Sequence, residues 1–223
     1  QQLQSVAEVC RRHGVLVMAD EVMTGMGRCG RNFAVEHWGV APDILIAAKG
    51  LSSGYAPLGA VIANKKVVDA ISEGSGAFLH GFTYNAHPMS MAAGRAVLRY
   101  LKEHKLVEAA DSVREGSVAA ILRREMESLY ELDCVGDVRG IGMLLGVEFV
   151  EDRRTKRPYP AAKGFSSLVG KAAAKRGVLV YPMQGTVDGV EGDHLLIAPP
   201  AVMSAEEIKW TVARLKEAIG EVG

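Results

Sequence analysis

The chain has 223 residues, with 26 Lys or Arg and 26 Asp or Glu, so its formal net charge is zero. This balance gives no electrostatic reason to expect a nucleic-acid or membrane-surface partner. Charged residues interrupt every apolar stretch too often for a membrane span, and the first residues lack the pattern of a signal peptide. The three cysteines, at no metal or disulfide spacing, favour a reducing compartment. We therefore expect a cytoplasmic protein.

In the first half of the chain, short apolar runs alternate with helical periodicity. The predicted strands are residues 15–19, 44–48 and 58–63, and the predicted helices are residues 1–13, 65–73 and 89–103. The first two strand runs have the composition of strands that are buried on both faces of a mostly parallel sheet. The glycine-rich stretch 24–42 predicts a long loop with a helical turn near 33–38, and long ordered loops are usually functional.

The second half has a different pattern. A helix is expected at 107–129, and strand, strand, helix, strand, strand and helix follow it. These elements are predicted at 135–140, 143–150, 162–176, 178–181, 195–197 and 205–222. The order predicts a compact α+β layer.

Two charged residues each follow a predicted strand: Asp20 follows the first and Lys49 the second. Parallel sheets bind ligands just beyond the carboxyl ends of their strands, so we expect both side chains beside a ligand. An acid and an amine held together suit pyridoxal phosphate: a lysine forms a Schiff base with its aldehyde, and an aspartate keeps its pyridine nitrogen protonated. For each residue alone a simpler reading is open, with Asp20 as a helix N-cap and Lys49 as a solvated loop residue.

Several further motifs accompany this pair in a fixed order. They are Asp20-Glu21-Val22-x-x-Gly25-x-Gly27-Arg28-x-Gly30, Asp43-x5-Lys49-Gly50-x3-Gly54, Pro57-Leu58-Gly59-Ala60, His80-Gly81-Phe82-Thr83-Tyr84-Asn85-Ala86-His87-Pro88, Val138-Arg139-Gly140-Ile141-Gly142 and Ala198-Pro199-Pro200. By these motifs the chain resembles, nearly end to end, the class III pyridoxal-phosphate-dependent aminotransferases of the ω-amino acid, ornithine and 4-aminobutyrate type.

The resemblance implies an α/β fold of two domains. Residues 1–104 would be the carboxyl-terminal part of a fold-type-I large domain, which binds the cofactor on a mixed, mostly parallel sheet. Residues 105–223 would be a small α+β domain. A homodimer or higher oligomer is also implied. Family members are longer than this chain, so we expect it to be a carboxyl-terminal half without the phosphate-binding loop.

Four site residues are implied by the same resemblance. Lys49 would form the Schiff base and shuttle protons, and for this it is expected to be buried. Asp20 would hold the pyridine nitrogen protonated, Val22 would pack on one face of the ring, and Thr83 would bind the phosphate across a dimer interface. No metal site is expected, since His80 and His87 have no Cys or carboxylate at ligand spacing.

The chain also departs from the family pattern. Met23 stands where relatives often have a glutamine near the cofactor, and Leu196 stands where ornithine- and 4-aminobutyrate-type relatives have an arginine that clamps the substrate carboxylate. The loop 185–194 lines the substrate entrance in one reading and is simply solvated in the other. Structural roles are expected for Glu21 and Arg139.

The expected function is transamination between an amine or ω-amino acid and a keto acid through the Lys49 Schiff base. An alternative from another class stays open: a catalytically incompetent fragment that only dimerises or binds a partner, because the phosphate loop is missing. A nucleotide-binding loop at Lys49 is excluded by residue order. Such a loop has its glycines before the lysine and a Ser or Thr directly after it, whereas here Gly50 follows.

Overall fold

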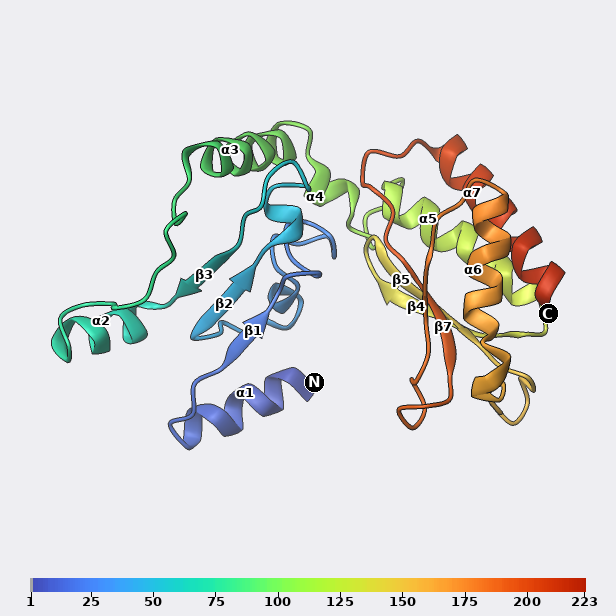
Figure 1. Cartoon of the computed structure of the whole chain (residues 1–223), viewed down its shortest axis with the longest axis horizontal. Helices are drawn as coiled ribbons and strands as arrows, with labels where there is room; N and C mark the ends of the chain where they lie inside the picture. Colours follow the sequence, from blue (N-terminus) through green and yellow to red (C-terminus); the bar gives the residue numbers. More distant parts are fainter. Residues whose placement is uncertain (1) are drawn as a thin grey trace. The chain divides into compact units, whose positions relative to one another are not determined.

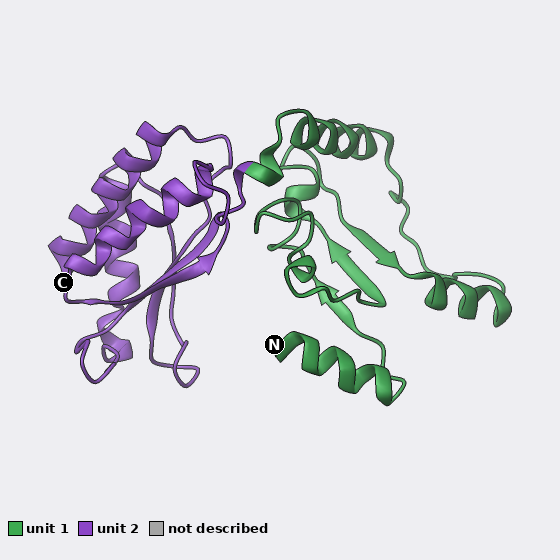
Figure 2. Ribbon diagram, turned by 180° about the vertical axis from the view of Figure 1, so that it is seen from behind, with its two compact units in different colours: residues 1–108 green, residues 109–223 purple. Residues whose placement is uncertain are grey.

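The computed structural model describes residues 2–223 and divides into two compact units, residues 1–108 and 109–223 (Figure 2). The division into a large-domain part at 1–104 and a small domain at 105–223 stays a prediction. Within the described residues, no helix is both long enough and apolar enough to cross a membrane.

Unit 1 is built around a mixed three-stranded sheet of order β1-β2-β3 (Figure 1). The strands are β1 (Met18–Asp20), β2 (Ile44–Ala47) and β3 (Ala60–Ala63), and the helices are α1 (Gln2–Arg12), η1 (Ala34–Trp38), η2 (Lys49–Leu51), α2 (Lys65–Glu73) and α3 (Pro88–Glu103), with α4 (Leu106–Ala109) at the boundary. Strands β1 and β2 are parallel and β2 and β3 are antiparallel. The prediction for α2 is confirmed to the residue, and its N-cap Asn64 accepts a hydrogen bond from Val67 N.

Asp43 ties the three strands together at one edge of this sheet. Its Oδ2 accepts a hydrogen bond from Val17 N, just before β1, and its Oδ1 accepts one from Asn64 Nδ2, just after β3, both at 2.9 Å. The backbone bonds Asp43 N to Val17 O and Asn64 N to Asp43 O are both 2.8 Å. The bond from Val17, followed by that from Asn64, lowers the pKa of the Asp43 carboxyl. A single acidic side chain thus aligns the starts of β1 and β2 with the end of β3.

The expectation that the first two strands are buried on both faces is wrong for β1, whereas β2 has no exposed residue. Met18 is 60% exposed, and on β3 Val61 is 71% exposed. The reason is the small number of strands: β2 alone has a neighbour on both sides, and the buried cluster of unit 1 consists of Val35, Leu45 and Ala47. Strand β1 is also shorter than predicted, because Val15 and Leu16 are exposed and lie outside the pairing.

Unit 2 is an antiparallel four-stranded sheet of order β4-β5-β7-β6 packed against helices (Figure 1). Its elements are α5 (Val118–Glu127), η3 (Ser128–Glu131), β4 (Val135–Ile141), β5 (Leu144–Phe149), η4 (Ala161–Lys163), α6 (Phe165–Lys175), β6 (Tyr181–Met183), β7 (Asp193–Ile197) and α7 (Ala205–Val222). Every second residue of β5 and β7 is buried, so one face of the sheet forms the core and the other does not.

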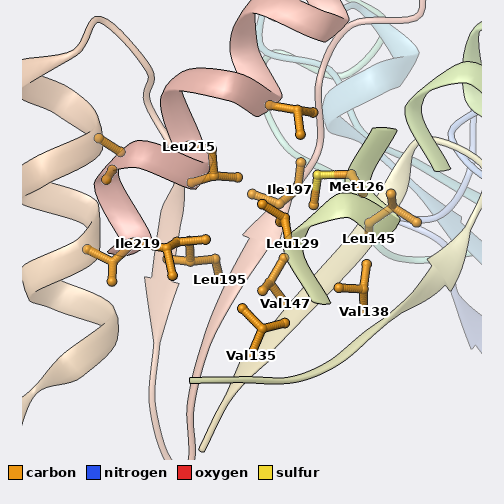
Figure 3. Packing of buried hydrophobic residues seen from close by; sticks show 14 of the residues in the cluster. Met126, Leu129, Val135, Val138, Leu145, Val147, Leu195, Ile197, Leu215 and Ile219 are labelled. Carbon is orange, nitrogen blue, oxygen red and sulfur yellow. The ribbon is translucent and has the colours of Figure 1, made fainter. Parts of the chain in front are cut away.

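The core of unit 2 is one continuous apolar cluster between this sheet and the helices (Figure 3). Its members include Met126, Leu129, Val135, Val138, Leu145, Val147, Leu195, Ile197, Leu215 and Ile219. Full burial of each such side chain contributes about 2 kcal/mol relative to exposure. Unit 2 therefore has a much larger apolar driving force for folding than unit 1.

Two predictions for unit 2 are wrong in detail. The single helix at 107–129 is two helices, because α4 ends at Ala109 and α5 begins only at Val118. The interruption has local causes: Gly116 has a φ of 72°, and Ser117 is an N-cap that accepts a hydrogen bond from Ala120 N. The strand predicted at 178–181 lies instead at Tyr181–Met183, because Val178 N still bonds to Ala173 O at the end of α6.

We expect Gly140→Ala to destabilise unit 2 strongly. Gly140 has a φ of 149°, and a Cβ there would lie 2.1 Å from Leu144 O and 2.7 Å from Leu145 Cα. Because these contacts are with backbone, we expect a loss of about 2–4 kcal/mol in the free energy of unfolding. Urea denaturation followed by Trp210 fluorescence in a Trp38→Phe background measures it.

The matched control is Gly146→Ala on the neighbouring strand, where the nearest atoms to a new Cβ are 3.9 Å away. It should cost less than about 1 kcal/mol. Equal midpoints for Gly140→Ala and the parent chain would contradict the backbone geometry of β4.

Candidate functional site

The parallel pairing of β1 and β2 brings Asp20 and Lys49 to one edge of the unit 1 sheet, here called the carboxyl edge. Strand β1 ends at Asp20, β2 ends at Ala47, and Lys49 opens the short helix η2. Asp20 is paired in register with Ile46, so Lys49 follows three residues beyond the position opposite Asp20. Carboxyl ends of parallel strands in such sheets are where ligands bind. The structure therefore brings together the acid and the amine that the sequence analysis selected.

Lys49 has an unusual backbone. Its φ of 43° lies in the left-handed region, which costs a non-glycine residue on the order of 1 kcal/mol. The turn is held by hydrogen bonds from Leu51 N to Ala48 O at 2.9 Å and from Ser52 N to Lys49 O at 3.2 Å. The expectation that Lys49 is buried is wrong for the described residues, since its side chain is exposed beyond the end of β2. A strained residue that presents an amine at a sheet edge is typical of a functional position.

Asp20 is fixed by its own chain. Its Oδ1 accepts a hydrogen bond from Val22 N at 2.9 Å, and the carboxylate is exposed. The residues that follow form turns and not a helix, so the reading of Asp20 as a helix N-cap is wrong. Val22 is half-buried in the first of these turns.

Glu21 is buried directly beside the exposed Asp20 and is 3% exposed. Its carboxylate accepts hydrogen bonds from Ala34 N at 3.0 Å and Val35 N at 2.8 Å, and Thr24 Oγ1 donates to it as well. The structural contact expected for Glu21 is thus present, at the first residues of η1.

Cys29 lies in the same loop, buried at 4% exposure. Burial is the main cause that raises the pKa of its thiol to about 11, and the nearby charge of Glu21 raises it further. The thiol is therefore protonated over the whole physiological pH range.

The glycine after Lys49 has a specific neighbour. A Cβ on Gly50 would lie 3.0 Å from Met26 Cβ, so the loop that follows β1 packs directly against the residue beside Lys49. Met26 itself has a left-handed φ of 56°. The close approach at Gly50 is thus to a side chain of the same unit.

The remaining candidates belong to other turns, strands and loops of the two units. Thr83 is exposed in a turn before α3. Met23 is 47% exposed. Leu196 and Arg139 belong to unit 2: Leu196 pairs with Gly146 and Tyr181, and Arg139 forms ion pairs with Asp137 at 3.0 Å and Glu148 at 2.5 Å.

The loop 185–194 connects β6 to β7 and runs into the first residues of β7. Its ends are held by hydrogen bonds from Thr186 N to Gly192 O at 3.4 Å and from Val187 N to Glu191 O at 3.0 Å. Residues 186–190 of the loop are exposed, whereas residues 192 and 193 are buried. A contribution of this loop to a substrate entrance stays a prediction.

Sequence reasoning missed the roles of Asp43 and Met26. The motif that contains Asp43 gave this residue no role. An acid directly before a strand is nevertheless a signal, because its carboxylate can accept hydrogen bonds from the segments beside it, as Asp43 does from Val17 N and Asn64 Nδ2. Met26 gave no signal, because its contact with Gly50 depends on the path of a long loop.

Comparison with known proteins gives a consistent picture. The sequence profile of the family described as aminotransferase class-III matches residues 1–219. An uncharacterized aminotransferase of Bacillus subtilis, YodT, is 41% identical over 98% of this chain and 48% of its own length. An adenosylmethionine-8-amino-7-oxononanoate aminotransferase of Anoxybacillus flavithermus is 33% identical over 98% of this chain and 46% of its own length. The chain spans about half the length of the curated relatives that it matches.

Solved structures agree with the sequence relatives. A transaminase from the marine bacterium Virgibacillus superposes with a TM-score of 0.91 at 33% identity, over 99% of this chain and 48% of the other. An amine transaminase from an uncultivated Pseudomonas species, solved in a PLP-bound form, gives a TM-score of 0.86 at 38% identity, over 98% of this chain and 47% of the other.

We expect Cys29 to resist alkylation in the folded chain. With a pKa of about 11, roughly one molecule in a thousand carries the thiolate at pH 8, and the reaction should accelerate about tenfold per pH unit up to pH 11. Iodoacetamide labelling with peptide mapping measures this, and the partly exposed Cys10 is the internal control. Modification of Cys29 at pH 8 as fast as Cys10 would contradict the buried loop.

Proposed function

Because the chain belongs to the class III aminotransferase family, we propose that its carboxyl edge binds pyridoxal phosphate and that the protein transfers amino groups between an amine or ω-amino acid and a keto acid. The observation that carries the proposal is the register of β1 with β2, which presents Asp20 and Lys49 at the same edge. The left-handed backbone at Lys49 adds support, since the chain maintains a strained residue there.

The residues present at this edge fit the cofactor. Bound pyridoxal phosphate supplies an aldehyde that condenses with amines and a pyridinium ring that accepts electrons. Asp20 is exposed, with one oxygen held by Val22 N, and its carboxylate would accept a hydrogen bond from the ring N–H⁺. Val22, two residues further on, is the proposed packing surface for one face of the ring.

Lys49 has two proposed tasks. With pyridoxal phosphate bound, its Nζ would condense with the aldehyde carbon with loss of water, and once an amine substrate had displaced it, the same Nζ would move the proton on the substrate carbon. Its place at the start of η2 leaves the amine accessible beyond the end of β2.

The other proposed contacts come from other parts of the chain. Thr83, in its exposed turn, is the proposed phosphate ligand across the interface of a homodimer or higher oligomer. Leu196 is apolar and cannot pair with a carboxylate, which favours amines or acids whose carboxylate is bound elsewhere. The three free cysteines agree with a cytoplasmic location.

We expect Lys49→Ala to abolish covalent attachment of pyridoxal phosphate and any transamination. Borohydride reduction of the mixture, followed by peptide mapping, locates the label. The matched control is Lys66→Ala, which removes a lysine from α2, outside the carboxyl edge, and should leave the labelling of Lys49 unchanged. Label on another lysine in the parent chain would refute the assignment. Absence of any label would favour the alternative, a partner-binding fragment.

We expect Asp20→Asn to lose far more activity than cofactor affinity. The amide nearly keeps the shape but cannot hold the pyridine nitrogen protonated, so the barrier should rise by about 2–4 kcal/mol, roughly 30- to 1000-fold in rate. Turnover is measured on the chain alone and again after addition of the amino-terminal half of the B. subtilis relative. The chain matches 48% of the length of that whole relative. We expect weak activity alone and rescue by the added half. Unchanged turnover in Asp20→Asn would rule out its role at the ring nitrogen.

A further inference from the structure

The starting observation is a buried acid directly after an exposed one. Glu21 is 3% exposed, whereas Asp20 before it is exposed. The strand pairing continues through Glu21, whose N donates to Ile46 O at 2.9 Å, and side chains alternate in direction along such a segment. Glu21 therefore points away from the side of Asp20. A carboxylate is costly to bury unless hydrogen bonds compensate for its lost hydration.

The compensation comes from the start of η1 and from the turn after β1. Both carboxylate oxygens are used: Oε1 accepts from Val35 N at 2.8 Å, and Oε2 accepts from Ala34 N at 3.0 Å and from Thr24 Oγ1. Bonds to an ionised acceptor are about twice as strong as bonds between neutral groups. Glu21 therefore joins the end of β1 to a segment thirteen and fourteen residues further along the chain.

The backbone of Glu21 fixes the intervening turn. Its carbonyl oxygen accepts from Gly25 N at 2.9 Å, and a Cβ on Gly25 would lie 2.8 Å from the same oxygen. The turn can close this tightly because residue 25 is glycine. Every polar group of Glu21 is thus bonded, and the loop 22–33 is held at both ends.

The same loop reaches the other half of the site. Met26, one residue after this turn, packs against Gly50, where a Cβ would come within 3.0 Å of Met26 Cβ. Gly50 is the second residue of η2 and follows Lys49 directly. A contact path therefore runs from the backbone carbonyl of Glu21 through Gly25 and Met26 to the turn that carries Lys49, and the Glu21 carboxylate holds the same loop through Thr24 and through Ala34 and Val35.

We propose that Glu21 is a positioning residue: it touches neither cofactor nor substrate, and it holds the loop that sets Asp20 and Lys49 relative to each other. The inference rests on the proposed function for its chemical meaning, because Asp20 and Lys49 are the groups being positioned. Displacement of reacting groups by about 1 Å can cost on the order of 100-fold in rate.

The test compares Glu21→Gln with Glu36→Gln. Gln has about the shape of Glu, but an NH2 group replaces one of the two oxygens, so a donor then faces Ala34 N or Val35 N where an acceptor stood before. Glu36 is a matched control, because its carboxylate accepts from Phe33 N in the same loop but is exposed. The readout is the rate at which pyridoxal phosphate and borohydride label Lys49, well below the unfolding temperature. Labelling of Lys65, on α2, is the internal control.

We expect labelling of Lys49 to fall roughly tenfold or more in Glu21→Gln and by less than about twofold in Glu36→Gln, with Lys65 unchanged in both. A merely stabilising role would leave the rate at Lys49 unchanged in the folded state. Wild-type labelling of Lys49 in Glu21→Gln, with faster hydrogen exchange at Ala34 and Val35, would overturn the proposal.

A second readout separates this proposal from the proposed function. The hydrogen bond from Val22 N to Asp20 Oδ1 is observable by NMR, as the response of the Val22 amide signal to ionisation of Asp20. If the parent chain is never labelled at Lys49, the proposed function fails. The positioning role then stands if this response is lost in Glu21→Gln and kept in Glu36→Gln, and it is overturned if both variants keep it.

A milder variant covers the case in which Glu21→Gln does not fold. Thr24→Val removes one donor to the Glu21 carboxylate and keeps the charge and both backbone bonds. We expect this variant to fold. Its Lys49 should be labelled more slowly than in the parent chain but still measurably, and the response of its Val22 amide signal should be smaller than in the parent but not lost. Parent values for both quantities in Thr24→Val would overturn the proposal.

Discussion

The parallel pairing of β1 with β2 is the constraint on which the candidate site depends. Two parallel neighbours end at the same edge of a sheet, so an acid and an amine far apart in sequence become neighbours only if this register is kept. A slip of one residue would turn the end of β1 to the other face. Asp43 fixes the register where the strands begin, and Glu21 ties the end of β1 to the first residues of η1.

The two units are stabilised in different ways. Unit 2 has a continuous apolar core between sheet and helices, which includes Phe149 and Phe165 with ring centroids 4.9 Å apart. In unit 1, the buried cluster has three residues, and hydrogen bonds donated to buried or half-buried acids set the positions of strands and loop. Directional bonds of this kind suit a site, because they define where groups point, whereas apolar burial mainly supplies free energy.

The sequence predicted the parts of this structure that depend on local pattern. The bounds of α2 and α7 follow from their caps and periodicity, and the positions of Asp20 and Lys49 follow from strands that end in a charge. Features that depend on distant partners were not predictable. Leu16 belongs to an apolar run that is typical of a strand, but it lies outside β1. The break before α5 depends on Ser117, which acts as an N-cap inside an otherwise helical sequence pattern. The exposure of Lys49 depends on which elements surround it, and no local pattern encodes that.

The central claim is that Asp20 and Lys49 act on one bound molecule. The most direct test uses pyridoxal phosphate labelled with ¹⁵N in the ring, added at saturating concentration and then fixed to the protein by borohydride. The account predicts label on Lys49 and a ring nitrogen whose ¹⁵N chemical shift is that of a pyridinium at neutral pH, and it predicts the shift of a neutral pyridine in Asp20→Asn. A molecule fixed to Lys49 whose ring nitrogen has the same shift in both proteins would contradict it.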